Sequence, residues 1–364
     1  MFILKMGRGK LMKLEKLRLA LEERGVDALL ITNDYSRRYI TGFTGTAGVA
    51  IVSKNDAVFI TDFRYTEQAA SQIKDFRIVQ HAKTLIEEIS HQVNEMGIKS
   101  LGFEKDDVTY GVYELYKQAV SADLVPLSGV VEKIRLIKTD EEISIIKAAC
   151  RIADEAYEHI VTYIKPGMTE LQVSNELEFF MRKRGATSSS FDTIVASGTR
   201  SALPHGVATD KVIEVGDFVT LDFGALYNGY ISDTTRTLAV GEPSEKLKEI
   251  YQVVLDAQLL ALEKVQPGMT GKEADAIARD YIASKGYGEA FGHSLGHGIG
   301  LEVHEGPGLS FRSDIVLEPG MVITIEPGIY LPNIGGVRIE DDALVTENGL
   351  EKLTHSTKEL LILS

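Results

Sequence analysis

Cysteine is almost absent from this sequence of 364 residues. The single cysteine, Cys150, cannot form a disulfide within the chain. It ends a helical pattern of apolar residues at 145–150, and free cysteine is among the residue types most often buried, so we expect an unreactive thiol in the core. A fold that needs no disulfide is compatible with a reducing compartment.

Basic residues are also scarce. The chain has 39 Lys and Arg against 53 Asp and Glu, which gives a formal net charge of -14. Proteins that bind nucleic acids neutralise phosphates with clustered Lys and Arg, and no basic stripe of useful length occurs here. A nucleic-acid partner is therefore not expected.

Long apolar runs are missing too. The longest ones have the length of a strand, whereas a helix that crosses a membrane needs about 20 apolar residues. The beginning of the sequence also lacks the apolar core and small-residue cleavage site of a signal peptide. We therefore expect no membrane partner and a cytoplasmic location.

The length predicts two domains. Residues 12–130 alternate helical and strand patterns, beginning with an amphipathic helix at 13–24, which is typical of a small α/β domain. Residues 133–364 form the second, and its first helix should begin at Asp140 behind a capping box made by Thr139 and Glu142. The basic, unpatterned residues 1–11 are expected to be an additional N-terminal segment, with Met12 as the natural start.

The second domain contains an internal repeat. A Pro-Gly-Met-Thr motif at 166–169 recurs at 267–270, and each copy stands between two helical patterns. Asp222 and Glu326 are equivalent in the two halves, because the same glycine spacing surrounds both. Each half is predicted to contain two helices followed by an antiparallel β region. A pseudo-twofold sheet with helices outside would bring the acidic residues of both halves together at its centre.

Four carboxylates lie in apolar segments that favour strands: Asp222, Asp233, Glu326 and Glu340. An unpaired ionised carboxylate is too costly to bury, so each needs a partner. Pairing of Asp233 with Arg236 is one solution, but the occurrence of all four in two related halves favours bound cations. Asp341 is an alternative to Glu340 as the acidic ligand. Otherwise Asp341 and Asp342 are expected to be solvated turn residues.

A glycine-rich segment at 292–305 contains three of the eight histidines, which are His293, His297 and His304. Glycine permits close approach of the backbone, and a neutral imidazole is the commonest metal ligand. We expect one of these histidines to bind a metal and the others to assist. His205, at the end of the corresponding element in the first half, is a fourth candidate. The remaining four are expected to be incidental: His81, His91, His159 and His355.

Four carboxylates and one imidazole match two divalent ions about 3.5–4 Å apart, as in two-metal hydrolases. The imidazole of this set is that of His297. Oxygen-rich ligands favour Mn²⁺, with Co²⁺, Fe²⁺ or Zn²⁺ able to substitute. Such a pair would turn a bridging water into hydroxide at neutral pH and polarise a carbonyl. The residues thus predict an enzyme that hydrolyses amides or esters.

The segments around these residues resemble the ligand segments of the pita-bread metallopeptidases, which include methionine aminopeptidase, aminopeptidase P and prolidase. They are 221–224 (LDFG), 232–236 (SDTTR), 296–300 (GHGIG), 325–328 (IEPG) and 338–341 (RIED). The first domain is similar to the creatinase-type domain of the proline-specific branch through 39–45 and 61–65. The resemblance implies an α+β chain, in which a smaller N-terminal α/β creatinase-type domain precedes a C-terminal pita-bread fold with its pseudo-twofold repeat.

The resemblance also implies roles for the residues. Asp233 and Glu340 would bridge the metals, Asp222 would complete one coordination sphere, and His297 and Glu326 would complete the other. Glu326 would in addition pass a proton to the leaving nitrogen. By the same resemblance His205 and His304 would bind the scissile peptide and its tetrahedral intermediate. His293 would line the proline subsite, Arg338 would orient the site, and a homodimer is expected.

The implied substrate is a peptide with an N-terminal Xaa-Pro bond, a tertiary amide without an N–H that ordinary peptide recognition uses. The compact chain and the 14-residue step from Glu326 to Glu340 favour an Xaa-Pro dipeptidase, or prolidase. One alternative is an Xaa-Pro aminopeptidase (aminopeptidase P) that acts on longer peptides. Another is a non-catalytic, protein-binding module, but such a module would have lost ligands, and all five are present.

Overall fold

The computed structural model describes residues 13–364, which divide into two compact units between Arg135 and Leu136. The boundary expected from the sequence was at 130–133. The segment 1–11 and the proposed start at Met12 lie outside the described residues. The N-terminal unit contains one cluster of buried hydrophobic side chains and the C-terminal unit contains two, and the units are described separately.

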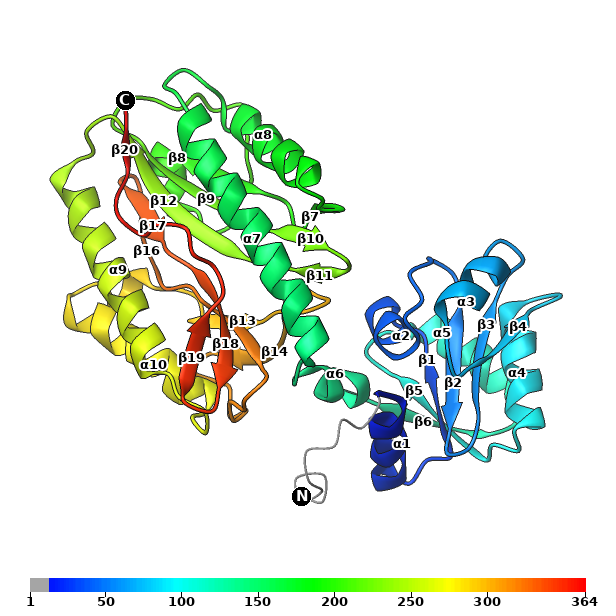
Figure 1. Cartoon of the computed structure of the whole chain (residues 1–364). Helices are drawn as coiled ribbons and strands as arrows, with labels where there is room; N and C mark the ends of the chain where they lie inside the picture. Colours follow the sequence, from blue (N-terminus) through cyan, green and yellow to red (C-terminus); the bar gives the residue numbers. More distant parts are fainter. Residues whose placement is uncertain (1–12) are drawn as a thin grey trace. The chain divides into compact units, whose positions relative to one another are not determined.

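The N-terminal unit is a six-stranded mixed sheet with the order β4-β3-β2-β1-β5-β6 (Figure 1). The strands are β1 (Ala28–Ile31), β2 (Val49–Ser53), β3 (Ala57–Thr61), β4 (Arg77–Gln80), β5 (Ser100–Glu104) and β6 (Asp123–Leu127). The helices are α1 (Lys13–Arg24), α2 (Asp34–Thr41), α3 (Thr66–Gln72), α4 (Leu85–Glu95), α5 (Tyr110–Ala119) and α6 (Val130–Arg135). All four residues of β1 are apolar and buried, as expected of a central strand. The predicted α/β class of this unit is confirmed.

One buried carboxylate makes the stability of this unit depend on pH. Glu104, at the end of β5, accepts hydrogen bonds from the backbone N–H groups of Thr32 and Asn33. Burial raises the pKa of Glu104 from about 4.5 to about 7. The folded chain therefore keeps a proton that the unfolded chain releases, so the free energy of unfolding should fall as the pH rises from about 4.5 through about 7.

Glu104→Gln removes this titration and keeps an acceptor oxygen. We expect the variant to match the wild type near pH 4 and to be more stable by up to about 3 kcal/mol at pH 8. Urea unfolding at both pH values, followed by hydrogen exchange of the α2 amides, measures the difference. An equal difference at both pH values would contradict the assignment.

The C-terminal unit combines two larger antiparallel sheets with four long helices. The helices are α7 (Asp140–Tyr163), α8 (Glu170–Lys183), α9 (Glu245–Lys264) and α10 (Gly271–Ser284). One sheet has the order β20-β12-β9-β8, built from β8 (Ile194–Ser197), β9 (Phe218–Phe223), β12 (Thr234–Val240) and β20 (Ile362–Leu363). Within it β20 alone runs parallel to its neighbour, β12.

The second sheet has the order β14-β13-β15-β18-β19. Its strands are β13 (Gly296–Gly298), β14 (Glu305–Leu309), β15 (Val322–Ile325), β18 (Asp341–Thr346) and β19 (Gly349–Lys352). Two smaller sheets are made by β7 (Ser188–Ser189), β10 (Ala225–Tyr227) and β11 (Tyr230–Ile231), and by β16 (Gly328–Leu331) and β17 (Gly335–Arg338). The unit also contains two short 3₁₀ helices, η2 (Gly198–Ala202) and η3 (Gly288–Ala290).

The internal repeat is present in this structure. Thr169 and Thr270 both cap the second helix of their half with a capping box. The strand pair β9 and β12 corresponds to the pair β15 and β18, and both pairs are antiparallel. Figure 1 shows α7 and α8 over the first half and α9 and α10 over the second. The predicted pita-bread fold with its pseudo-twofold repeat is confirmed.

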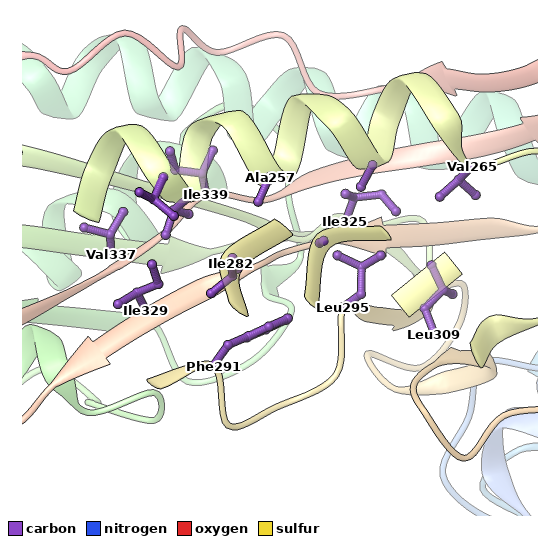
Figure 2. Close-up of a cluster of buried hydrophobic side chains, with 14 of the residues drawn as sticks. Ala257, Val265, Ile282, Phe291, Leu295, Leu309, Ile325, Ile329, Val337 and Ile339 are labelled. Carbon is purple, nitrogen blue, oxygen red and sulfur yellow. The ribbon is translucent and has the colours of Figure 1, made fainter. Parts of the chain in front are cut away.

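The core fixes which way the acidic residues point. In Figure 2 the side chains of Ala257 on α9, Ile282 on α10 and Ile325 on β15 gather in one hydrophobic cluster, which also contains Ile339. Glu326 follows Ile325, and Glu340 follows Ile339. Because successive side chains of an extended segment alternate in direction, both glutamates point away from the cluster. Leu221 and Phe223, the neighbours of Asp222, face the core of the first half in the same way.

Within residues 13–364, no helix is both long enough and apolar enough to cross a membrane.

Candidate metal centre

One cavity of about 540 Å³ in the C-terminal unit is lined by every residue that the sequence proposed for the site. These are His205, Asp222, Asp233, His293, His297, His304, Glu326, Arg338 and Glu340. The volume lies in the range of small-ligand sites. The four histidines expected to be incidental are not among the lining residues.

The carboxylates reach the cavity from equivalent places in the two halves. Asp222 lies on β9 and Asp233 directly precedes β12, while Glu326 directly follows β15 and Glu340 directly precedes β18. The chain between the first two turns back at Asn228-Gly229, where both residues have positive φ, as a tight hairpin turn requires. The repeat thus delivers two carboxylates from each half to one place.

His297 stands among these carboxylates. Its Nε2 lies 3.2 Å from Oε1 of Glu326 and 3.7 Å from Oδ2 of Asp233. Its Nδ1 lies 3.1 Å from the carbonyl oxygen of Gly298, which can only accept a hydrogen bond, so the ring is held with Nε2 toward the acids. Ligand atoms of Asp233, His297 and Glu340 lie within 4.8 Å of one another, close enough to hold one metal ion.

Polar neighbours fix the other ligand candidates. Thr324 accepts a hydrogen bond from the backbone N–H of His297 and donates to Glu326 over 3.1 Å. Thr235 donates to Oε2 of Glu340 over 2.6 Å and accepts from Nε of Arg338. Such second contacts set the direction of each ligand atom before any ion is bound.

Arg338 is the centre of the polar contacts on the Asp222 side. It donates to Oδ2 of Asp222 over 2.5 Å, to the hydroxyl of Tyr330 and to the carbonyl oxygen of Pro204. The other oxygen of Asp222, Oδ1, is buried and has no hydrogen-bond partner in the described part of the chain. A buried carboxylate oxygen without a partner is costly, which marks a place where a cation fits.

The two remaining histidines of the glycine-rich segment lie beside this centre. His293 Nδ1 is 2.8 Å from the carbonyl oxygen of Ser294, and its Nε2 is 2.8 Å from the hydroxyl of Tyr330. Burial lowers the pKa of His293, which favours the neutral ring. His304 packs against His297 with 4.4 Å between ring centroids, and burial together with His297 lowers the pKa of His304.

The electrostatics of the cavity demand positive charge. Burial and the neighbouring carboxylates raise the pKa of Asp233 and of Glu340 well above their ordinary values, and burial raises the pKa of Asp222. Burial also opposes ionisation of Glu326, but its hydrogen bond with His297 lowers the pKa of Glu326 overall. Because these four carboxyl groups line one cavity, they ionise together only when cations lie among them. The donor set and the unpartnered oxygen of Asp222 thus fit two divalent ions.

One expectation from the sequence is wrong, and one alternative that the sequence left open is excluded. Asp341 and Asp342 are fully buried on β18 rather than solvated in a turn. Asp341 pairs with Arg236 and Lys358 at 2.7 Å each, so Arg236 neutralises Asp341 and not Asp233. The expectation of a solvated turn is wrong because a new strand, β18, begins at Asp341 directly after Glu340, and its first five residues are buried.

Asp342 has a structural partner close to the site. Its Oδ2 accepts hydrogen bonds from the backbone N–H of Asp233 and from the thiol of Cys150. Cys150 is buried as predicted, and burial raises the pKa of its thiol. This thiol therefore contributes to the support of the Asp233 backbone.

The sequence also left several lining or supporting residues unnamed. Thr235 could have been found, because it lies two residues after Asp233 and shares its face of the strand. Tyr330, Phe191 and Asp192 reach the site through the fold, and we find no sequence signal for them.

Comparisons with known proteins cover both units of the chain. Residues 144–347 match metallopeptidase family M24, and residues 13–137 match the creatinase/prolidase N-terminal domain. The chain is 45% identical to an Xaa-Pro dipeptidase of Pyrococcus horikoshii over 96% of its own length and 98% of that protein.

Solved structures are similar over the same extent. An Xaa-Pro dipeptidase from Bacillus anthracis superimposes with a TM-score of 0.95 and 65% identity, covering 96% of this chain and 99% of that one. An X-Pro aminopeptidase from Thermotoga maritima superimposes with a TM-score of 0.90 and 43% identity, again covering 96% and 99%.

Proposed function

Since the chain belongs to metallopeptidase family M24, we propose that this metallopeptidase hydrolyses the Xaa-Pro bond next to a free N-terminus, with Xaa-Pro dipeptides as its substrates. The observation that carries the proposal is the meeting of all nine candidate residues in one cavity. The Xaa-Pro dipeptidases of Pyrococcus horikoshii and Bacillus anthracis supply the substrate class. Residues 133–364 are the catalytic domain in this proposal.

In this proposal two divalent ions would be held by Asp222, Asp233, His297, Glu326 and Glu340. Mn²⁺ suits this oxygen-rich set best, and Co²⁺, Zn²⁺ or Fe²⁺ could replace it. When bound, the ions would supply a hydroxide nucleophile at neutral pH and polarise the scissile carbonyl.

The side chains of the chain itself would orient the substrate and move the proton. Glu326 takes a proton from the attacking water and delivers it to the proline nitrogen. This nitrogen carries no hydrogen in the Xaa-Pro bond, so it needs the proton when the bond to the carbonyl carbon breaks. His205 and His304 donate to the carbonyl oxygen as negative charge develops on it. His293, kept neutral by burial, lines the subsite for the proline ring. Arg338 holds Asp222, and through Thr235 it holds Glu340.

A second candidate is an Xaa-Pro aminopeptidase acting on longer peptides. A dipeptidase needs a cation for the carboxylate at the end of its substrate. The arginine that lines the cavity, Arg338, already donates to Asp222, Thr235, Tyr330 and the carbonyl of Pro204. The similarity to the X-Pro aminopeptidase of Thermotoga maritima supports the same alternative.

Hydrolysis assays distinguish these functions. Protein reconstituted with Mn²⁺, Co²⁺ or Zn²⁺ is compared on Xaa-Pro dipeptides, Xaa-Pro-Yaa tripeptides and longer peptides. We expect cleavage of the dipeptides, with the highest activity in Mn²⁺. Efficient release of the first residue from longer peptides would move the assignment to an aminopeptidase. Inactivity with every metal would instead favour a non-catalytic, protein-binding module.

Assembly and location belong to the same proposal. A homodimer follows from the resemblance to the proline-specific branch, and the mass of the reconstituted protein in solution tests it. A cytoplasmic location is supported by the single, buried cysteine, because the fold needs no oxidising compartment.

A further inference from the structure

His205 reaches the cavity from the segment that joins β8 to β9. The loop leaves β8 at Ser197, passes through the 3₁₀ turn η2 and continues to Thr209. Near its tip, the carbonyl oxygen of Pro204 accepts a hydrogen bond from Arg338. The position of His205 therefore depends on how the base of this loop is held.

A buried carboxylate outside the cavity holds that base. Glu170, the first residue of α8, has no exposed surface and is not among the residues that line the cavity. Its Oε1 accepts from the backbone N–H and the hydroxyl of Ser197, at 2.8 and 2.9 Å. Its Oε2 accepts from the backbone N–H and the hydroxyl of Thr209, at 3.1 and 2.9 Å. One carboxylate thus joins the two ends of the loop.

Arg200 completes the contact in the middle of the loop. Its guanidinium forms an ion pair with Glu170 and also donates to the carbonyl oxygen of Val207 over 2.9 Å. Both flanks of His205 are thereby tied to one buried charge. The guanidinium and four further donors compensate for the burial of the carboxylate.

Helix α8 itself does not need Glu170. Its N-terminus is already capped by the reciprocal hydrogen bonds between Thr169 and Gln172. The second half of the repeat has no carboxylate at this place. The equivalent of Glu170, at the offset of 101 residues, is Gly271, and α10 begins there with its own capping box. The carboxylate therefore serves the loop and not the repeated fold.

We propose that Glu170 is a positioning residue, which holds the loop 197–209 so that the imidazole of His205 meets the scissile carbonyl. This inference rests on the proposed function for the role of His205. It predicts that the effect of Glu170 on catalysis passes through His205.

A double-mutant cycle tests the proposal. Glu170→Gln in the reconstituted enzyme should lower kcat/KM for an Xaa-Pro dipeptide roughly 10- to 100-fold, because a small misplacement of a catalytic group is enough for such a loss. In the His205→Ala background, Glu170→Gln should lower kcat/KM by less than about twofold. Metal content should stay at the wild-type level in each variant. If the loss of kcat/KM in the double variant equals the product of the losses in the two single variants, the proposal is overturned.

A second variant and a matched control complete the cycle. Arg200 is partly exposed, so Arg200→Gln tests the same contact if Glu170→Gln fails to fold. The loss of kcat/KM that it causes should also vanish in the His205→Ala background. Glu104→Gln makes the same chemical change at another buried carboxylate that accepts backbone N–H groups, and its effect should combine with His205→Ala as independent changes do.

Hydrogen exchange separates this inference from the proposed function. In metal-free protein, Glu170→Gln should speed exchange of the amides at 198–209 by at least about tenfold and leave β9 unchanged. Unchanged exchange in the loop would overturn the positioning role whatever the substrate. A wild type that cleaves no Xaa-Pro peptide while this exchange effect is present would instead overturn the proposed function and leave Glu170 as the residue that holds the loop.

Discussion

Asp233→Asn should abolish hydrolysis of Xaa-Pro peptides and lower bound metal below two ions per chain. Asp233 offers a ligand atom within 4.8 Å of ligand atoms of both His297 and Glu340. A carboxylate spreads one negative charge over two oxygens, whereas the amide of asparagine offers one neutral oxygen, so the proposed metal ions would lose an anionic ligand. We expect kcat/KM to fall at least about 1000-fold, equivalent to about 4 kcal/mol.

The measurements are metal analysis after dialysis and kcat/KM with an Xaa-Pro dipeptide. Asp256→Asn is the matched control, because this aspartate accepts hydrogen bonds from Gln252 and Tyr281 away from the cavity. The control should keep both metal and activity. A fully active, metal-replete Asp233→Asn enzyme would refute the assignment of the centre.

Loss of activity in this variant should not come from unfolding. Burial and Glu340 raise the pKa of Asp233, so its ionised form opposes folding of the metal-free chain at neutral pH. Replacing this carboxyl by a neutral amide removes that opposition. The Tm of the metal-free variant is therefore expected to equal or exceed that of the metal-free wild type.

Glu326→Gln should have the second large effect, but with a different signature. Glutamine keeps the shape and one oxygen ligand, yet it cannot take a proton from water and hand it to the leaving nitrogen. General acid–base groups contribute about 100- to 10,000-fold, so we expect kcat to fall by roughly that range while KM changes only a few-fold. Metal should be retained better than in Asp233→Asn.

Steady-state kinetics across the pH range and metal analysis check this prediction. Glu351→Gln, which removes a partner of Lys147 from an exposed ion pair on β19, is the control and should leave kcat unchanged. A Glu326→Gln enzyme with wild-type kcat would remove Glu326 from proton transfer.

Several features were predictable from the sequence because they depend on near neighbours. The capping box of Thr139 and Glu142 spans four residues, and it is present at the start of α7. The turn at Asn228-Gly229 has the positive φ values that its two residues favour. The repeat motif predicted two corresponding β regions, and the antiparallel pairs β9 with β12 and β15 with β18 are both present.

Other features depend on partners more than a hundred residues away. Thr235 meets Glu340, Arg338 meets Asp222, and Arg236 meets Asp341, each through pairing of the two halves. No local pattern records these contacts. The wrong prediction of solvated Asp341 and Asp342 arose here, because acidic residues after a strand segment are usually exposed and only the packed sheet shows them covered.

The sequence by itself determined the donor types, the repeat and the alternation of core and acidic residues, since these follow from side-chain chemistry and the period of a strand. Only the tertiary structure decided which oxygen atoms face one another, which carboxylates are neutralised by arginine and which remain for cations. It also revealed the support of the His205 loop by Glu170. The physical reason is that burial and charge pairing are set by segments brought together in space, and these set the cost of each ionised group.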